Sequence, residues 1–365
     1  MEQNKSTFLA THYSGRRVLV TGSTGFKGAW LCHMLAKLGA DVCGYALKPP
    51  TMPSLWVEAN IAQDVRQITS DIRDFAALES TFRRFQPQTV LHLAAQPLVI
   101  ESYAQPRYTY ETNVMGTVNV LECVRTTPSV TSLLNVTTDK VYENREIEDY
   151  GYREDDKLDG HDPYSNSKSC SELVTHSYAR SFFASDSRSD AAYRCAISTA
   201  RAGNVIGGGD FAAHRIVPDC VRAALEGKPL ILRNPNSVRP FQHVLEPLVA
   251  YLLIAALQVK DSTKQGWYNI GPSKEDCITT GQLVTYFAEA WGSDFKWETQ
   301  MQVGPHEANY LKLNSDKARQ ILDWQPCWNV REAVQRTVNW TRAWQSGSAR
   351  IEMDKQVQDY LGALA

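Results

Sequence analysis

Two hydrophobic patterns alternate along the first 200 residues of the chain. Short runs rich in β-branched residues are typical of strands, and they occur at 17–21, 41–47, 65–68, 89–93, 132–137 and 193–199. In the longer segments between them, apolar residues recur every three or four positions, as on one face of a helix; these segments are 28–38, 75–85, 109–125 and 164–182. Strands that alternate with helices predict right-handed crossovers, and therefore an α/β fold with a Rossmann-like, doubly wound parallel sheet.

The alternation fades after residue 200. Gly207-Gly208-Gly209 and Gly271-Pro272 are typical of loops, and isolated helical patterns occur at 218–225, 244–259, 279–291, 330–344 and 351–361. We expect residues 1–200 to form the sheet domain and residues 201–365 to form a smaller, mixed lobe, which leaves scope for a strand or helix that returns to the first domain. No low-complexity linker separates the two parts, so we expect a broad interface between them.

Composition narrows the class of protein. The 365 residues are 43% hydrophobic and 21% charged, with a formal net charge of -2, which suits a compact protein without the basic stripe that nucleic-acid binding needs. Residues 1–15 lack the features of a signal peptide, and the most apolar segment, 244–259, is shorter than the about 20 residues that span a bilayer. We therefore expect a cytoplasmic protein with neither nucleic-acid nor membrane partners. The eight cysteines show no ligand spacing, which predicts no metal site.

A glycine-rich turn follows the first predicted strand. Residues 18–28 read VLVTGSTGFKG, which is an apolar strand, a G-x-x-G-x-x-G turn and the start of a helix. Gly22 suits the tight turn, Gly25 lets a pyrophosphate approach the backbone, and Gly28 lets the helix pack on the strand. Free amides at the helix start would hold the phosphates. The residues predicted to bind a dinucleotide here are Gly22, Thr24, Gly25, Phe26, Lys27 and Gly28.

The signal for the adenosine half of a dinucleotide is weaker. An NAD site usually has an Asp or Glu at the end of the second strand, but this strand ends at Leu47-Lys48. Lys48 could favour a 2′-phosphate, so these residues leave NAD and NADP both open. Asp71 and Ile72 suit an adenine pocket, with a carboxylate for the exocyclic amine and an apolar flank for the ring. An exposed loop aspartate is the alternative interpretation.

A tyrosine and a lysine share one face of the helix predicted at 164–182. Asp162 can cap this helix and Pro163 suits its first turn, while Tyr164 and Lys168 lie one turn apart. A nearby ammonium lowers the pKa of a tyrosine, so a phenolate can take a proton from a hydroxyl as hydride leaves the same carbon. Lys168 can also hold a nicotinamide ribose.

The strand predicted at 132–137 leads into Thr138, Asp139 and Lys140. The carboxyl ends of parallel strands are where a doubly wound fold binds its ligands, and the hydroxyl of either Thr137 or Thr138 can bridge a substrate hydroxyl and Tyr164. A simple dehydrogenase needs no further acid and amine, so Asp139 and Lys140 indicate chemistry beyond hydride transfer. A structural ion pair is the alternative interpretation of these two residues.

Several motifs together resemble extended short-chain dehydrogenases that act on nucleotide sugars. They are the glycine loop, HLAAQ at 92–96, NVMGT at 113–117 and the Tyr164/Lys168 pair. More narrowly, GFKG, AAQPLV, TDKVYEN, DPYSNSK, RAGNVIGGGD and RPFQHVLEPL resemble the CDP-glucose 4,6-dehydratases, over nearly the whole chain. Small departures from the family pattern mark a divergent member; they are Ser23, Val141, Ile147 and Phe241.

The resemblance implies a lyase of deoxysugar biosynthesis, as for lipopolysaccharide O-antigen, that uses NAD to convert CDP-glucose to CDP-4-dehydro-6-deoxyglucose and water. Oxidation at C4 acidifies the C5 proton, loss of this proton and the 6-hydroxyl gives an enone, and hydride returns to C6. Tyr164 would be the base at the 4-hydroxyl and Asp139 the acid for the leaving 6-hydroxyl. Lys140 would act at C5, either as a neutral base or as a charged stabiliser of the enolate.

The resemblance also implies a set of site residues. The catalytic residues would be Thr138, Asp139, Lys140, Tyr164 and Lys168. Cofactor contacts beyond the glycine loop would come from Asp71, Ile72, Leu93, Ala94, Ala95, Thr112, Tyr164 and Lys168. Substrate contacts would come from Gln96, Thr138, Asn204, Arg215, Arg233, Arg239, His306 and Tyr310. Arg239 is the strongest candidate for binding the diphosphate, although each arginine taken alone could equally be a solvated charge.

The resemblance also bears on the oligomeric state and on alternative functions. Members of the family pair through helices that correspond to 109–125 and 164–182, so we expect a homodimer or a homotetramer. Another NDP-sugar dehydratase or a 4-epimerase would use the same fold, but an epimerase needs no acid for a leaving hydroxyl. A non-catalytic regulator that senses a cofactor would need the fold alone. The Asp139-Lys140 pair favours the dehydratase over both alternatives.

Overall fold

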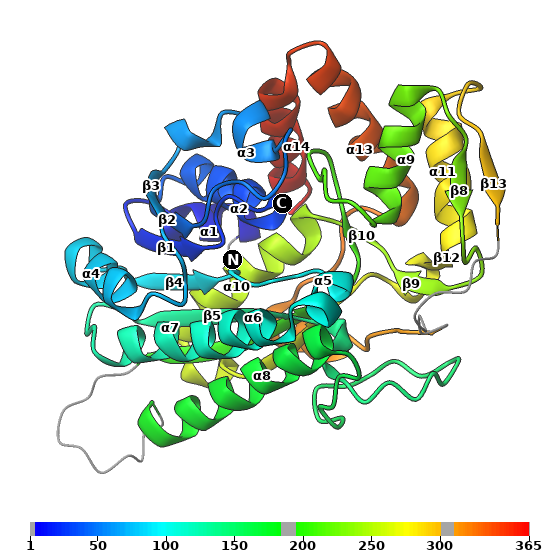
Figure 1. Cartoon of the computed structure of the whole chain (residues 1–365). Helices are drawn as coiled ribbons and strands as arrows, with labels where there is room; N and C mark the ends of the chain where they lie inside the picture. Colours follow the sequence, from blue (N-terminus) through cyan, green and yellow to red (C-terminus); the bar gives the residue numbers. More distant parts are fainter. Residues whose placement is uncertain (1–3, 184–194, 301–309, 365) are drawn as a thin grey trace.

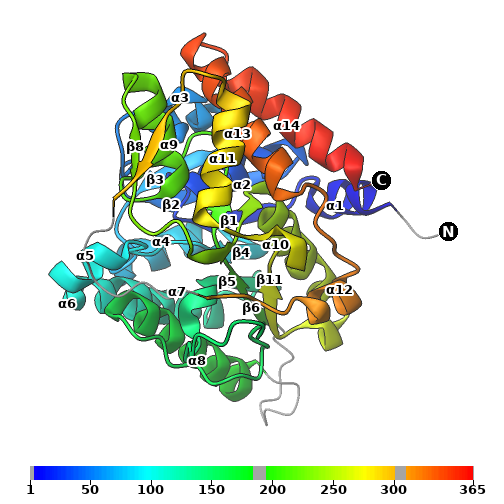
Figure 2. The same cartoon turned by 90° about the vertical axis from the view of Figure 1, so that its right-hand side faces the viewer.

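The computed structural model of the protein describes residues 4–183, 195–300 and 310–364. Its centre (Figure 1) is a seven-stranded parallel sheet in the order β11-β6-β5-β4-β1-β2-β3, whose strands are all labelled in Figure 2. These strands are β1 (Arg17–Thr21), β2 (Asp41–Ala46), β3 (Arg66–Thr69), β4 (Thr89–His92), β5 (Ser132–Thr138), β6 (Ala196–Ala202) and β11 (Trp267–Ile270). The strand order reverses between β1 and β4, where a doubly wound sheet opens a crevice for ligands. The predicted fold class is confirmed.

Each face of the sheet has its own apolar core, because successive strand residues point to opposite faces. Val18 and Val20 belong to the core that includes α2 (Phe26–Lys37) and α10 (Leu245–Lys260). Leu19, between them, belongs to the core on the other face. The helices on that face are α4 (Phe75–Phe85), α7 (Gly116–Arg125) and α8 (Pro163–Phe182). Within the described part of the chain, no helix has both the length and the apolar composition needed to cross a bilayer.

The chain beyond β6 builds a smaller lobe and also returns to the sheet. The lobe packs helices around a third apolar core; they are α9 (Ile216–Glu226), α11 (Thr280–Trp291) and α13 (Val330–Gln345). Two strand pairs flank them, β8 (Leu230–Leu232) with β13 (Trp297–Thr299) and β9 (Val238–Pro240) with β12 (Cys277–Thr279). In contrast, β11 is an edge strand of the main sheet, and α14 (Ala349–Ala363) ends beside α1 (Lys5–Tyr13) (Figure 2).

The remaining elements are short. They are α3 (Leu55–Glu58), α5 (Val99–Ala104), α12 (Asp316–Leu322), β7 (Val205–Ile206), β10 (Gln242–His243), η1 (Ile61–Gln63), η3 (Asp139–Val141), η4 (Ser262–Lys264) and η5 (Lys274–Asp276).

Most predicted elements agree with the structure to within a few residues, but the helix predicted at 109–125 is divided. It consists of α6 (Pro106–Tyr110), the π-helical turn η2 (Glu111–Met115) and α7 in succession. π-Helical turns are rare and often lie at functional sites. The strand predicted at 193–199 is β6, and residues 193 and 194 lie outside the described residues.

Candidate active site

The glycine loop joins β1 to α2 at the carboxyl edge of the sheet. Gly22 has a φ of 73°, and a Cβ at this position would lie 2.8 Å from the amide nitrogen of Ala94. A Cβ on Gly28 would lie 2.1 Å from the carbonyl oxygen of Gly22, so glycine is required for α2 to start this close to β1. Gly25 is the N-cap and no side chain caps α2, which leaves first-turn amides available for phosphates. The loop therefore fits a dinucleotide.

Further predicted cofactor residues lie at the end of β4 and on η2. Thr21 Oγ1 accepts hydrogen bonds from the amides of Leu93 and Ala94, each at 3.1 Å, and Ala95 follows them half-buried. The Thr112 hydroxyl is buried and has no hydrogen-bond partner among the described residues. A buried hydroxyl without a partner costs free energy, and a bound cofactor could supply the missing acceptor.

In the adenosine half of the predicted site, some side chains already bond to other residues of the protein. Both carboxylate oxygens of Asp71 accept hydrogen bonds from the Arg73 side chain, the shorter at 2.7 Å. The side chain of Ile72 packs so closely on Gly116 that a Cβ there would lie 2.8 Å from it. Thr24 Oγ1 donates to the carbonyl at the end of β2, at 2.9 Å. An adenine amine would have to share Asp71 with Arg73, so this contact remains a prediction.

The end of β5 places Thr138 and Asp139 beside Tyr164. Thr138 Oγ1 donates to Asp139 Oδ1 at 2.9 Å, and the same hydroxyl acts to lower the pKa of the Tyr164 phenol. Asp139 is 2% exposed, and its Oδ2 has no hydrogen-bond partner among the described residues. A Cβ on Gly203 would lie 3.0 Å from Oδ2, so the backbone of Gly203 lies close to this oxygen. Burial raises the pKa of Asp139, although the charge of Lys140 opposes the rise.

The start of α8 places Tyr164 and Lys168 as the sequence predicts. Asp162 accepts a hydrogen bond from the Ser165 amide at 3.0 Å, and Pro163 is in the first turn. Burial raises the pKa of Tyr164 to about 12, although the hydrogen bond with Thr138 opposes the rise. We expected Lys168 to lower this pKa, but burial dominates it. Lys168 Nζ instead donates to a β5 carbonyl at 3.1 Å, and burial and Lys27 lower its own pKa to about 8.

Two further cationic side chains border this group. Lys140 lies in η3 and is half-buried, with its amide 3.4 Å from Thr138 Oγ1. Lys27 lies in the first turn of α2, where burial and the charge of Arg215 lower its pKa to about 8 while Asp139 opposes the shift. Phe26, beside it, lies so close to Gly207 that a Cβ there would be 3.2 Å from its ring. Lys27 of the glycine loop and Asp139, which directly follows β5, are therefore close enough for their charges to influence each other.

Some of the predicted substrate residues lie around this group. The charge of Arg239 opposes the rise that burial causes in the pKa of Asp139. The charge of Arg215 does the same for the pKa of Tyr164. Tyr310 forms a β-bridge with the residue before Arg239. Asn204 follows β6, and its carbonyl accepts a hydrogen bond from the Gln242 amide at 3.0 Å.

Other predicted substrate residues are not brought to this group. Arg233 follows β8 and is exposed. Its charge influences the pKa of Asp219 on α9 instead, where it opposes the rise caused by burial. The Gln96 side chain is buried and bonded within its own segment, because Nε2 donates to Leu98 O at 3.1 Å and to Thr109 Oγ1 at 2.9 Å. A substrate contact by Gln96 would have to replace these bonds. His306 lies outside the described residues.

Sequence reasoning missed a buried acid beneath the site. Glu172 follows Lys168 by one turn of α8 and is 0% exposed. Its partners are Thr137, Thr199, Arg201 and His176. The ion pair with Arg201 measures 3.0 Å, and both side chains are inaccessible to solvent. The spacing from Lys168 could have placed Glu172 on the same face of the helix, but no local pattern links it to Arg201 on β6.

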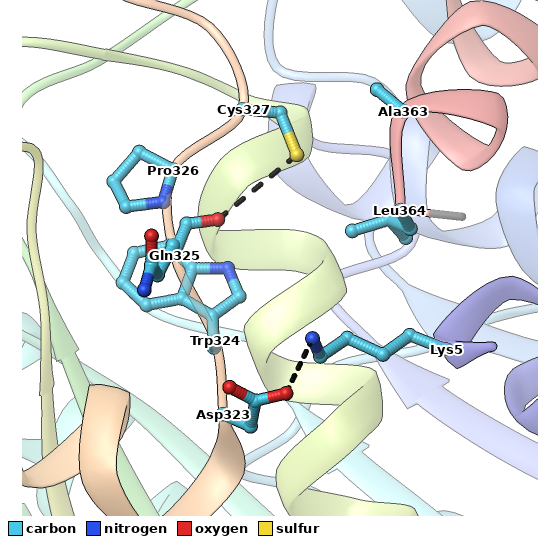
Figure 3. A pocket seen from close by; sticks show the side chains of 8 residues that line it. All are labelled: Lys5, Asp323, Trp324, Gln325, Pro326, Cys327, Ala363 and Leu364. Carbon is cyan, nitrogen blue, oxygen red and sulfur yellow. Dashed lines mark hydrogen bonds and ion pairs between the residues drawn. The ribbon is translucent and has the colours of Figure 1, made fainter. Parts of the chain in front are cut away.

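A separate pocket of about 440 Å³ lies where α1, the end of α14 and the loop before α13 meet (Figure 3). Figure 3 shows Lys5 directed at Asp323, and their ion pair measures 2.7 Å. The thiol of Cys327 also lines the pocket, and burial raises its pKa, so it is a weaker nucleophile than an ordinary cysteine. None of the predicted site residues that the structure describes lines this pocket. The described residues also contain no cluster of three His, Cys, Asp or Glu side chains suited to a metal ion.

Known proteins share both the sequence and this architecture. The family model for GDP-mannose 4,6 dehydratase matches residues 19–337. The CDP-glucose 4,6-dehydratase of Salmonella typhimurium is 44% identical over 354 residues, which cover 96% of this chain and 98% of that protein. The solved UDP-glucose 4-epimerase of Thermus thermophilus, a complex with NAD, is 26% identical and has a TM-score of 0.75, covering 89% of this chain and 99% of its own. A dTDP-glucose 4,6-dehydratase structure from Bacillus anthracis, 23% identical over 91% of this chain and 98% of its own, shares the fold with a TM-score of 0.74. The chain therefore belongs to the GDP-mannose 4,6 dehydratase family and, within it, to the CDP-glucose 4,6-dehydratases.

Proposed function

We propose that the protein uses NAD to convert CDP-glucose to CDP-4-dehydro-6-deoxyglucose and water. The observation that carries the proposal is the buried Oδ2 of Asp139, which has no hydrogen-bond partner within the described part of the chain. Asp139 directly follows Thr138, whose hydroxyl acts on the phenol of Tyr164. Proton transfer to a leaving hydroxyl needs such an acid, whereas epimerisation does not. The relative that is 44% identical carries the same activity in its name and supports the choice of nucleotide.

The cofactor would lie along the edge formed by the glycine loop, the end of β4 and η2. Its pyrophosphate would meet the first-turn amides of α2, and Thr112 Oγ1 would gain a hydrogen-bond partner. Lys168 would exchange its bond to the Val136 carbonyl for the nicotinamide ribose. Bound NAD would supply the acceptor for the C4 hydride and the donor that returns it to C6.

Three side chains divide the proton transfers. Tyr164 accepts the proton of the 4-hydroxyl, which requires its raised pKa to fall when the positively charged nicotinamide and the substrate replace water. Asp139, whose pKa is raised by burial, keeps its proton more readily than an exposed aspartate and donates it to the departing 6-hydroxyl. Lys140 acts at C5, either as the base or as a charge that stabilises the enolate.

The two parts of the chain would have different roles in this reaction. Residues 1–200 would hold NAD and the catalytic side chains, and residues 201–365 would hold most of the nucleotide sugar. A homodimer or homotetramer would bury exposed apolar side chains near the helices predicted to pair, which include Met115, Leu173 and Phe182. We further propose that the enzyme acts in the cytoplasm, in the supply of a deoxysugar for lipopolysaccharide O-antigen.

The proposal is tested by incubating the purified protein with CDP-glucose and NAD. We expect a 4-keto-6-deoxy sugar, detected by its absorbance in alkali and by a product mass lower by one water. A C4 epimer of unchanged mass would replace the dehydratase with an epimerase. If neither product forms and NAD still binds, a cofactor-sensing role becomes the better account. Parallel incubations with the dTDP, GDP and UDP sugars test the choice of nucleotide.

A further inference from the structure

Arg215, at the N-cap of α9, is held by a buried carboxylate. Its Nη1 donates to Asp210 Oδ2 at 3.0 Å. The Asp210 side chain is 6% exposed and the Arg215 side chain is 37% exposed, so the carboxylate is buried while part of the arginine side chain stays accessible. The contact uses one of the five N–H groups of the guanidinium, which leaves a planar donor set for a further anion.

The loop that carries Asp210 is fixed on several sides. The Trp30 indole of α2 donates to the carbonyl of Gly208 at 3.0 Å. A Cβ on Gly208 would lie 2.1 Å from the ring of Trp340 on α13, so no larger residue fits there. Gly209 has a φ of 83°, a conformation that favours glycine. The loop therefore lies between the helix that begins at the glycine loop and a helix of the smaller lobe, and Asp210 has a defined position.

The guanidinium lies close to both halves of the predicted site. Its positive charge opposes the rise that burial causes in the pKa of Tyr164, and it adds to the lowering that burial causes in the pKa of Lys27, which lies in the glycine loop. These two residues stand where a sugar hydroxyl and the cofactor are expected to meet. A nucleotide sugar in this position would bring the negative charges of its diphosphate within reach of the accessible part of Arg215.

We propose that Asp210 is a positioning residue for substrate binding, because its carboxylate orients the Arg215 guanidinium toward the diphosphate of the nucleotide sugar. This inference rests on the proposed function, since it takes the nucleotide sugar as the ligand. A negative charge beside a phosphate site would by itself weaken anion binding, so the benefit must come from orientation. Arginine loses rotamer freedom when it is held, and holding it before the substrate arrives removes that cost from binding.

A purely structural role for Asp210 makes a different prediction. Asp210 Oδ1 also accepts a hydrogen bond from the Ala212 amide at 3.1 Å, which stabilises the loop. In Asp210→Asn the amide oxygen can keep this bond to Ala212, whereas the NH₂ group that replaces Oδ2 cannot accept from Arg215. The substitution therefore removes the ion pair and spares the loop.

The test is a double-mutant cycle on the binding of CDP, which cannot turn over, to the NAD-loaded protein by titration calorimetry. Charge-assisted hydrogen bonds predict that Arg215→Met weakens binding about 10- to 100-fold, and we expect Asp210→Asn to weaken it about fivefold. The double variant should bind no more weakly than Arg215→Met, because Asp210 acts only through Arg215. In turnover, Asp210→Asn should raise KM for CDP-glucose more than it lowers kcat.

Asp219→Asn is the matched control, because Asp219 pairs with Arg222 on the same helix, α9. It should leave CDP binding unchanged. Additive losses in the cycle, or unchanged binding in Asp210→Asn, would overturn the positioning role. If Asp210→Asn does not fold, the cycle is run with Asp210→Glu, for which the same absence of additivity is required. Wild-type protein that binds CDP but does not convert CDP-glucose would refute the proposed function and leave the result of the cycle unaffected.

Discussion

Two buried acids lie near the carboxyl end of β5, and their surroundings differ. Glu172 is surrounded by donors from α8, β5 and β6, and its charge is matched by Arg201 at 3.0 Å. Among the residues that the structure describes, Asp139 has one hydrogen bond, from Thr138, and its Oδ2 has no partner. The Arg201 charge and these hydrogen bonds lower the pKa of Glu172 despite its burial, whereas burial raises the pKa of Asp139. A satisfied acid is a structural element, and an unsatisfied one in a cleft is available for proton transfer.

The largest expected effect comes from breaking the satisfied pair. Glu172→Gln leaves the Arg201 charge buried without its counter-ion, and this should lower the free energy of unfolding by about 3–5 kcal/mol. Chemical denaturation followed by circular dichroism measures the change. The control is Glu226→Gln, which removes the exposed pair with Lys228 and should change the free energy of unfolding little. If Glu172→Gln lowered the free energy of unfolding no more than this control does, Glu172 would not be the structural acid that its contacts indicate.

The next effect concerns catalysis. Asp139→Asn removes the proton donor for the 6-hydroxyl but not the groups for C4 oxidation, so we expect water loss to slow about a hundredfold or more. Reduced nicotinamide should then accumulate in a single turnover with CDP-glucose, which its absorbance band reports. Equal slowing of both steps would show that Asp139 is not specifically the acid for elimination. Tyr164→Phe, which lacks the base for the first step, is the control in which no reduced nicotinamide should appear.

The two acids should also respond oppositely to pH. The folded pKa of Asp139 is raised, so its contribution to stability is present below its unfolded pKa, about 3.9, and is lost as pH rises through the folded value. Asp139→Asn should therefore be more stable than wild type at neutral pH, and the difference should vanish in acid. The folded pKa of Glu172 is lowered, so its contribution is present above about 4.3 and is lost as pH falls below that value. Unfolding curves across this pH range give both slopes, and parallel curves would contradict the assignment.

The smallest expected effect tests the same distinction in two hydroxyls. Thr112 Oγ1 is buried without a partner, whereas Thr109 Oγ1 is bonded to Gln96 and to the carbonyl of Gln105. Thr112→Val should weaken NAD binding about fivefold, as expected for one neutral hydrogen bond of about 1 kcal/mol, and should leave stability unchanged. Thr109→Val should instead lower stability by about 1–3 kcal/mol, because Gln96 loses its acceptor. Fluorescence titration with NAD and thermal unfolding separate the outcomes, and a stability loss in Thr112→Val would count against the cofactor contact.

The sequence predicts the local parts of the site well, because these parts depend on short-range geometry. The glycine loop needs Gly28 for its close approach to Gly22, and the start of α8 needs the Asp162 cap. Both requirements are met by residues that are neighbours in the chain. The parallel, doubly wound character of the sheet follows in the same way, from the alternation of strands and helices.

The remaining features depend on tertiary contacts, which a single sequence does not reveal. Glu172 and Arg201 lie 29 residues apart, and only the packing of α8 on β5 and β6 brings them together. Burial determines the pKa of Tyr164, which sequence reasoning assigned to Lys168 instead. The engagement of Gln96 with Thr109 also could not be predicted, because nothing in the spacing indicates that its amide is already bonded.

The edge position of β11 has a consequence for how the enzyme could be divided. β6 pairs with β5 on one side and with β11 on the other. In the sequence, β11 follows β6 only after strands and helices of the smaller lobe. A fragment that ends near residue 200 would expose the hydrogen-bonding edge of β6 and lose the apolar cover of α10, and such edges promote aggregation. The main sheet is therefore completed by a segment that follows the smaller lobe in the chain, so residues 1–200 do not form a self-contained unit.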